Sequence, residues 1–332
     1  MNVLYILGNG FDKAQGMATS YPEFYKYLTE NVKDGSPLLE KMKSAITEDT
    51  VLWSDMESGL GEFTSATNNA EEFDSFYFEL SEHLQNYLKK ENEKFLPSND
   101  LKTKFQTDFT TISKYLGALD KNRYNAFINK YSNSSKDISV ITLNYTDTLE
   151  KILSLNDTET TKSFLNSNNL RNLIHVHGRL GESIIIGVND EMQMYNENFR
   201  NNDNIKDCMI KLQSNRIMKE TRHIQCEKLI ANANFIVLMG VSLGDTDLYW
   251  WELIGKNLVN RKNIAVIQHI YRPNAILPTQ MQKRGRLERQ QQDMIMQKMG
   301  IKEENRTDEL RERLFFTINA PIFKIIDEIR QN

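Results

Sequence analysis

The fold class is indicated by the run Val3-Leu4-Tyr5-Ile6-Leu7-Gly8-Asn9-Gly10-Phe11-Asp12. Five apolar residues in succession are typical of a strand that is buried on both faces, as in a parallel sheet. The glycines that follow favour a tight turn into a helix, because glycine adopts positive φ angles without steric cost. This run therefore predicts the first strand, turn and helix of an α/β fold.

Further apolar runs complete the predicted sheet. Helical stretches separate most of them, which indicates a Rossmann-like, doubly wound and mostly parallel sheet flanked by helices. The runs that begin at Leu173 and Ser183 are too close together for a crossover helix, so we expect a hairpin or edge pair there. The predicted strands are Val3–Leu7, Ile138–Leu143, Leu173–His177, Ser183–Val188, Asn234–Met239 and Ile264–Ile270.

A long segment separates the first two predicted strands. Its apolar spacing predicts several amphipathic helices, interrupted by polar turns at Asp34–Pro37 and Pro97–Asp100. We therefore expect a first strand with its glycine loop (1–12), a helical insertion domain capping the sheet (13–136), the rest of the α/β domain (137–275) and a C-terminal helical segment (276–332). The helices expected in the insertion are Tyr21–Leu28, Leu38–Ile46, Phe73–Leu88 and Phe105–Leu116.

Composition restricts the function classes. The chain has 332 residues, 39% of them hydrophobic, which is enough for a sizeable core. Lys and Arg number 41 against 45 Asp and Glu, so the excess of positive charge that is typical of nucleic-acid binders is missing. Cys208 and Cys226 lack metal-ligand spacing, which argues against a zinc site. Without a signal peptide or an apolar run of about 18–20 residues, we expect a cytoplasmic protein with no membrane partner.

The first candidate site residues follow the first strand. Backbone N–H groups in a glycine turn can approach a pyrophosphate closely, and hydroxyl side chains lie a few residues further on. Residue 13 is Lys, so the full G-x-G-x-x-G pattern is absent, and a plain tight turn explains the two glycines equally well. The hydroxyls can also cap a helix that begins at Tyr21. The candidates for ligand binding are Gly8, Asn9, Gly10, Phe11, Asp12, Thr19 and Ser20.

The second group is Thr142-Leu143-Asn144-Tyr145-Thr146-Asp147, at the end of the second predicted strand. In open α/β sheets ligands bind beyond the carboxyl ends of the strands. Asn144 is therefore a candidate to hydrogen-bond a ribose or a water, with Thr146 beside it. Alternatively, both side chains form a turn and cap a helix over Asp147–Leu153.

The third group is His175-Val176-His177-Gly178. Alternation along a strand places both histidines on one face, and Gly178 lets the chain turn directly after His177. His177 at the strand end can accept a proton from a ribose hydroxyl, or it can be a histidine with a purely structural role. We expect His175, deeper in the strand, to be structural.

The fourth group is the loop Gly240-Val241-Ser242-Leu243-Gly244-Asp245-Thr246-Asp247. As a second glycine loop it offers Gly240, Ser242, Leu243 and Asp247 to a ribose or phosphate. Its G-x-S-x-G pattern also matches the nucleophile elbow of an α/β-hydrolase, with His269 as the available histidine. The sequence has no acidic residue at an intervening strand end, which disfavours this esterase alternative.

Two other features favour structural interpretations. Trp53, Asp55 and Glu57 can reach the crevice from the insertion, but an aromatic residue among acids is more typical of a packed anchor with a solvated face. The basic run Lys283–Arg289 is interpreted as an exposed helix face.

These four loops, in this order, resemble the AbiH family of bacterial abortive-infection proteins. Members of that family carry a GNGFD-type opening, an NYT-type motif, an HG dipeptide and a G-x-S-L-G-x-x-D loop. The resemblance spans nearly the whole chain and implies a role in phage defence. The matching stretches are Gly8–Asp12 with Gly16–Tyr21, Thr142–Glu150, His175–Gly178 and Gly240–Asp247.

AbiH proteins are in turn similar to the sirtuin-like fold, in which GAG, TxNxD, HG and GxS elements line an NAD pocket. This likeness implies that Gly8, Gly10 and Ser242 bind a dinucleotide, that Asn144 is the active-site asparagine and that His177 is the catalytic histidine. The chain departs from the pattern at Asn9 and Thr146, and it lacks the four-cysteine zinc module of deacetylating sirtuins.

The likeness therefore implies hydrolysis of NAD at the nicotinamide–ribose bond, with NAD or a related nucleotide as substrate or ligand and no required cofactor. Two alternatives stay open: a nucleotide-binding signalling module without catalysis, and the esterase. The helical insertion is a candidate surface for contacts between copies of the chain.

Overall fold

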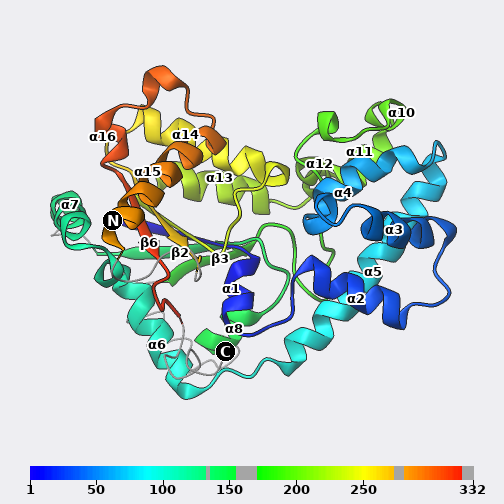
Figure 1. Ribbon diagram of the computed structural model, residues 1–332, viewed down its shortest axis with the longest axis horizontal. Coiled ribbons are helices and arrows are strands. Elements are labelled where there is room, and N and C mark those ends of the chain that lie inside the picture. Colours follow the sequence, from blue (N-terminus) through cyan, green and yellow to red (C-terminus); the bar gives the residue numbers. More distant parts are fainter. Residues whose placement is uncertain (132–134, 155–169, 273–279, 324–332) are drawn as a thin grey trace.

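The computed structural model describes residues 1–131, 135–154, 170–272 and 280–323. It contains a six-stranded sheet in the order β3-β2-β1-β4-β5-β6, and every neighbouring pair is parallel. The predicted α/β class with a helical insertion after the first strand is confirmed (Figure 1). The strands are β1 (Asn2–Leu7), β2 (Asp137–Thr142), β3 (Leu170–His175), β4 (Phe235–Met239), β5 (Ala265–Ile270) and β6 (Leu314–Ile318).

The sheet is buried on both faces because alternate residues of each strand enter different cores. In β1, Tyr5 and Leu7 join one core, whereas Leu4 and Ile6 join the other. The first core is covered by α6 (Asn99–Thr110), α7 (Ala118–Ile128) and α8 (Thr148–Leu153). The second is covered by α13 (Arg222–Asn232), α14 (Leu248–Asn260) and α15 (Met281–Lys298). The result is a three-layer arrangement with the sheet in the middle.

A third core holds together a separate group of helices, which we call the helical lobe. It consists of α2 (Tyr21–Asn31), α3 (Pro37–Glu48), α4 (Met56–Phe63) and α5 (Ala70–Lys94), together with α10 (Glu197–Arg200), α11 (Asp203–Met209) and α12 (Lys211–Ile217). Figure 1 shows these helices beside the sheet. The predicted helices at Tyr21–Leu28, Leu38–Ile46 and Phe73–Leu88 are confirmed, and Ser36 and Asn69 cap two of them.

The remaining short elements connect these parts. Helix α1 (Asn9–Ala14) follows β1 directly, and α16 (Asp308–Arg311) precedes β6. No helix among the described residues has the length and apolar character needed to cross a membrane. The 3₁₀ turns are η1 (Leu52–Ser54), η2 (Thr64–Ala66), η3 (Ile112–Tyr115), η4 (Asn129–Tyr131), η5 (Glu191–Gln193), η6 (Asp245–Asp247) and η7 (Glu303–Asn305).

The predicted strand at Ser183–Val188 is wrong, and so is the hairpin with the run at Leu173. The segment forms no strand of the sheet, although Ile184, Ile186 and Val188 are buried in the helical lobe's core. Its backbone bonds partly to other backbone groups, with Ile185 N donating to His177 O at 2.8 Å and Val188 N donating to Met209 O at 2.8 Å, and partly to side chains. Tyr77 Oη donates to Ile186 O at 2.9 Å and accepts from Ile186 N at 3.2 Å. Tyr145 Oη donates to Ile185 O. These contacts satisfy the backbone that a partner strand would otherwise satisfy.

The C-terminal part also differs from the expectation of helix throughout. Helix α15 is present, but Leu314–Ile318 forms β6 at the edge of the sheet. Leu314 and Phe316 face one core and Phe315 faces the other. The sequence signal of this strand is its short, nearly continuous apolar run, which is typical of a strand buried on both faces.

Candidate functional site

A cleft of about 950 Å³ lies at the carboxyl ends of the strands. It spans the point between β1 and β4 where the strand order reverses, which is where open α/β sheets bind ligands. The glycine loops after β1 and β4 contribute to its lining, together with the segment after β2. Tyr21, Asp55 and Glu57 of the insertion line it as well.

The glycines bring the two loops into close contact. Gly8 N donates to Met239 O at 3.0 Å, and Gly10 N donates to Gly240 O at 2.9 Å. A Cβ atom on Gly10 would lie 2.7 Å from Gly240 Cα, and Gly240 itself has a φ of +67°. Close approach of backbone therefore explains the glycines, and the amides of Gly8 and Gly10 are already used between the loops.

Most of the predicted site residues meet in this cleft, but two do not. Phe11 is buried against Phe105 and Phe323, and Leu243 is buried in the core between the sheet and α14. Both face away from the cleft, because the turns that present their polar neighbours direct these apolar side chains inward. The predicted residues that line the cleft are Gly8, Asn9, Gly10, Asp12, Thr19, Ser20, Asn144, Thr146, His177, Gly240, Ser242 and Asp247.

Asp12 anchors the segment after β2. Its carboxylate accepts from Asn144 Nδ2 at 3.0 Å and from the Thr146 hydroxyl, and Asn144 Nδ2 also donates to Gly8 O at 3.2 Å. Burial raises the pKa of Asp12 to about 6, although these hydrogen bonds oppose the shift. The alternative in which Asn144 and Thr146 cap the next helix is wrong: α8 begins after Asp147, and both side chains bond to Asp12.

His175 holds the backbone of Asn144. Its Nδ1 lies 2.9 Å from Asn144 O and its Nε2 lies 2.7 Å from Glu150 Oε1. Both neighbours are acceptors, so the ring is best satisfied as an imidazolium. Burial is the largest single influence and lowers the pKa of His175, but Glu150 and the Asn144 carbonyl together raise it, and the net shift is upward. The structural interpretation of His175 is confirmed, and Glu150 is its partner.

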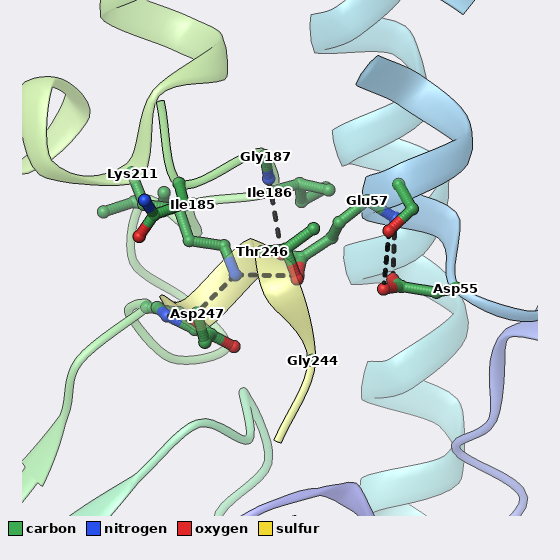
Figure 2. A network of polar contacts seen from close by, with 12 residues as sticks. Asp55, Glu57, Ile185, Ile186, Gly187, Lys211, Gly244, Thr246 and Asp247 are labelled. Atoms are coloured by element: carbon green, nitrogen blue, oxygen red, sulfur yellow. Dashed lines mark hydrogen bonds and ion pairs between the residues drawn. The ribbon is translucent and has the colours of Figure 1, made fainter. Parts of the chain in front are cut away.

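His177 belongs to a buried ionic cluster. Its Nε2 lies 3.0 Å from Asp247 Oδ1, a contact that is electrostatic rather than a well-aligned hydrogen bond. Lys211 Nζ lies 2.8 Å from the same Asp247 oxygen and 2.7 Å from Glu57 Oε2. Burial alone would raise the pKa of Asp247, but Lys211 and His177 hold it well below its usual range. Figure 2 shows Lys211 Nζ between the two carboxylates.

The insertion contributes both an anchor and polar groups. Trp53 is buried against Tyr25 and Phe63, as the structural interpretation predicted. Asp55 caps α4 by accepting from Glu57 N, and it also lines the cleft. The acids at this end of α4 therefore reach the crevice although the tryptophan does not.

The hydroxyl residues before α2, Thr19 and Ser20, form hydrogen bonds within the protein as well as lining the cleft. Ser20 and Glu23 form a capping box at the start of α2, as the helix-cap interpretation predicted. Thr19 and Asn9 bond to each other, since Asn9 Nδ2 donates to Thr19 O at 3.0 Å. Thr19 and Ser20 keep a surface on the cleft nevertheless.

The loop after β4 lacks the backbone of a nucleophile elbow. The positive φ falls on Gly240 and Leu243, at +67° and +55°, and not on Ser242, where the elbow requires its strain. His269 lines the cleft and its Nδ1 lies 3.0 Å from Thr317 Oγ1. These features give no support to the esterase alternative.

Sequence reasoning missed Lys211 and Glu150. Lys211 begins a short polar helix and resembles an exposed lysine, yet it is 5% exposed because two carboxylates from distant segments surround it. Glu150 lies inside a quoted motif, but its link to His175 depends on the pairing of β2 with β3. Across the described ranges, no three His, Cys, Asp or Glu side chains gather in a way that could hold a metal ion.

Comparison with known proteins identifies the family. The family model for bacteriophage abortive infection AbiH matches residues 4–269. This range includes every residue that lines the cleft except Tyr271, Ala320 and Ile322. A search of the curated proteins gave no match. Because the family match covers most of the chain, this protein belongs to the AbiH family of bacteriophage abortive-infection defence proteins.

Proposed function

We propose that this AbiH protein hydrolyses NAD at the nicotinamide–ribose bond in the cleft. The observation that carries the proposal is the convergence of Asn144 and His177. They follow β2 and β3, which are adjacent in the sheet, and both line a cleft at the reversal point of the strand order. That order, 3-2-1-4-5-6, is the one in which dinucleotides bind across the same crevice.

The reaction needs groups around the ribose. In the proposed step the bond between the ribose anomeric carbon and the nicotinamide nitrogen breaks, nicotinamide leaves with the bonding electron pair, and the water oxygen bonds to the same carbon. The water loses one proton, which His177 accepts through its second ring nitrogen, Nδ1. The products are ADP-ribose, nicotinamide and a proton.

Asn144 is suited to orient the ribose and the water. Both of its amide hydrogens are engaged, by Gly8 O and by Asp12, so its orientation is fixed before any ligand binds. The side-chain oxygen Oδ1 then remains as an acceptor for a ribose hydroxyl or for water. Asp12 contributes through Asn144 and is a positioning residue in this mechanism.

The pyrophosphate requires donors other than the Gly8 and Gly10 amides, which are already bonded. Lys13 and Ser242 line the cleft and supply a cation and a hydroxyl of the kind that bind phosphate. The likeness to the sirtuin-like fold stays a prediction from motif order, and it is consistent with this division of roles.

The direct test measures nicotinamide released from NAD by the purified protein and by His177→Ala and Asn144→Ala variants. We expect each substitution to reduce turnover at least about 100-fold, while NAD still binds in calorimetry. His83→Ala is the matched control, because His83 lies on α5 and does not line the cleft. NAD binding without turnover in the wild type, from uninfected and phage-infected cells alike, would favour the signalling module instead.

A further inference from the structure

The described contacts of His177 lead from the sheet into the helical lobe. Asp247 Oδ1 touches both His177 Nε2, at 3.0 Å, and Lys211 Nζ, at 2.8 Å. Lys211 Nζ in turn contacts Glu57 Oε2 at 2.7 Å. His177, Lys211 and Glu57 are each less than 10% exposed, so solvent screens these charges weakly.

Glu57 is fixed by groups outside its own helix. Its Oε2 accepts from Thr246 Oγ1 at 3.0 Å, and its Oε1 accepts from Gly187 N at 3.3 Å (Figure 2). Glu57 lies in the first turn of α4, where Asp55 caps the helix. One carboxylate of the helical lobe is therefore held by the loop after β4, by the segment after β3 and by Lys211 at once.

Lys211 offsets one of the two negative charges in this cluster. Glu57 and Asp247 are two carboxylates, and Lys211 is the cation between them. Removal of the lysine would leave both anions facing His177 and would favour its protonated form, which cannot accept a proton. Arg222 also reaches this region, beside Gly178 and paired with Glu220, and Asp55 lies on the far side of Glu57.

We infer that Lys211 and Glu57 are positioning residues that hold Asp247 against His177 and set the proton affinity of the imidazole. Lys211 offsets one of the two negative charges, and the second ring nitrogen of His177 is the atom that the proposed function assigns as the base. Glu57 keeps Lys211 in place and is supplied by α4, so the base is complete only when the helical lobe is seated on the sheet. This inference rests on the proposed function for its chemical purpose, but the charge coupling itself can be measured without NAD.

The experiment is a histidine NMR titration of the full chain. The sequence has five histidines, and the His177 signal is assigned by its loss in His177→Ala. We expect Lys211→Met to raise the pKa of His177 by about 1 or more, because two carboxylates lose their cation. We expect Glu57→Gln to lower it, because one anion is removed while Lys211 stays. Opposite shifts are the signature of charge coupling, since a general loss of structure would not reverse its sign.

Matched variants complete the design. Lys43→Met removes a lysine whose side chain is 13% exposed and lies in the helical lobe away from the cleft, and it should leave the pKa of His177 unchanged. Lys211→Arg keeps the charge and should restore the wild-type value. If Lys211→Met does not fold, the downward shift in Glu57→Gln remains as the test. An unchanged pKa of His177 in Glu57→Gln, or equal shifts in the same direction, would overturn the inference.

The activity measurement separates this inference from the proposed function. The pH at which nicotinamide release reaches half its maximum should move upward in Lys211→Met and downward in Glu57→Gln, in parallel with the NMR values. Opposite NMR shifts in a protein that never hydrolyses NAD would support the coupling and refute the hydrolase. Hydrolysis that depends on His177, with no NMR shift in either variant, would support the hydrolase and refute the coupling.

Discussion

At the scale of single residues, the carboxyl group of Asp12, which contacts Asn144, has a pKa that the fold clearly raises. It is 1% exposed, and burial raises its pKa to about 6. The pKa of this carboxyl is higher in the folded protein than in the unfolded chain, so between about pH 4 and pH 6 the folded protein binds more protons. The free energy of unfolding therefore falls as the pH rises through this range. Ionisation of Asp12, the residue that holds Asn144, thus lowers the free energy of unfolding.

Asp12→Asn should remove that pH dependence. Asparagine has the same shape, can accept from Asn144 Nδ2 and can donate to the Thr146 hydroxyl. We expect the free energy of unfolding of the wild type to fall relative to the variant by on the order of 2–3 kcal/mol between pH 4 and pH 6.5. Urea denaturation at several pH values measures the difference. Parallel curves for the two proteins would mean that Asp12 ionises normally.

Glu150 gives a second prediction at this scale. Glu150→Gln weakens the buried partner of His175 and leaves an imidazolium without its counter-charge. We expect a loss of about 3 kcal/mol in the free energy of unfolding. Glu40→Gln, which weakens the more exposed Lys43–Glu40 pair, should cost less than about 1 kcal/mol in the same urea titration. Equal losses in the two variants would show that the His175 pair is not structural.

At the scale of elements, the contact between the loops after β1 and β4 closes the floor of the cleft. Gly240 has a positive φ, and a Cβ atom there would lie 2.3 Å from Phe11 N. Gly16 also has a positive φ, of +80°, but nothing lies within 4 Å of its Cβ position. A side chain at position 16 would therefore introduce backbone strain alone, whereas a side chain at position 240 would introduce both strain and a steric clash.

Gly16→Ala should cost about 1 kcal/mol through strain alone. Gly240→Ala adds a clash with backbone that has no room to move, so we expect a loss of at least about 3 kcal/mol or no folded protein. Thermal unfolding of both variants provides the comparison. Similar melting temperatures would show that the two loops can separate without loss of the fold.

The positions of residues at strand ends could be predicted from the sequence, whereas contacts between distant segments could not. Asn144 and His177 were predictable because the carboxyl ends of parallel strands meet at one edge, and the strands after which they stand have clear apolar runs. Ser183–Val188 has the same apolar character, but Tyr77 and Tyr145 bond its backbone, and no local pattern announces partners so distant in the chain. The burial of Lys211 was not predictable for the same reason, because it depends on Glu57 and Asp247, which lie far away in the sequence.

At the scale of the whole molecule, the helical lobe and the sheet are connected both by the chain and by side-chain contacts. After β3 the chain passes into the helical lobe, to which residues 184–217 belong, and then returns to the sheet with α13. Tyr77 in α5 bonds this segment, and the Glu57–Lys211–Asp247 cluster ties α4 to the loop after β4. Such shared segments predict that the two parts unfold together rather than as separate domains.

The three tryptophans allow a test of this cooperativity. Trp53 lies in the helical lobe's core, whereas Trp250 and Trp251 pack against the sheet from α14. We expect the Trp53→Phe variant and the Trp250→Phe, Trp251→Phe double variant each to unfold in one fluorescence transition that coincides with its own loss of helical circular dichroism. A tryptophan signal that is lost well before the helical signal would indicate a helical lobe that opens on its own.

The central claim is that the cleft consumes NAD during phage defence. The most direct measurement is the NAD content of cells that produce the wild type or the His177→Ala variant, with and without phage, alongside growth. We predict that NAD falls only in infected cells that carry the wild type, and that growth stops there. Growth arrest in both strains with unchanged NAD would contradict the account and assign the cleft to nucleotide binding without hydrolysis.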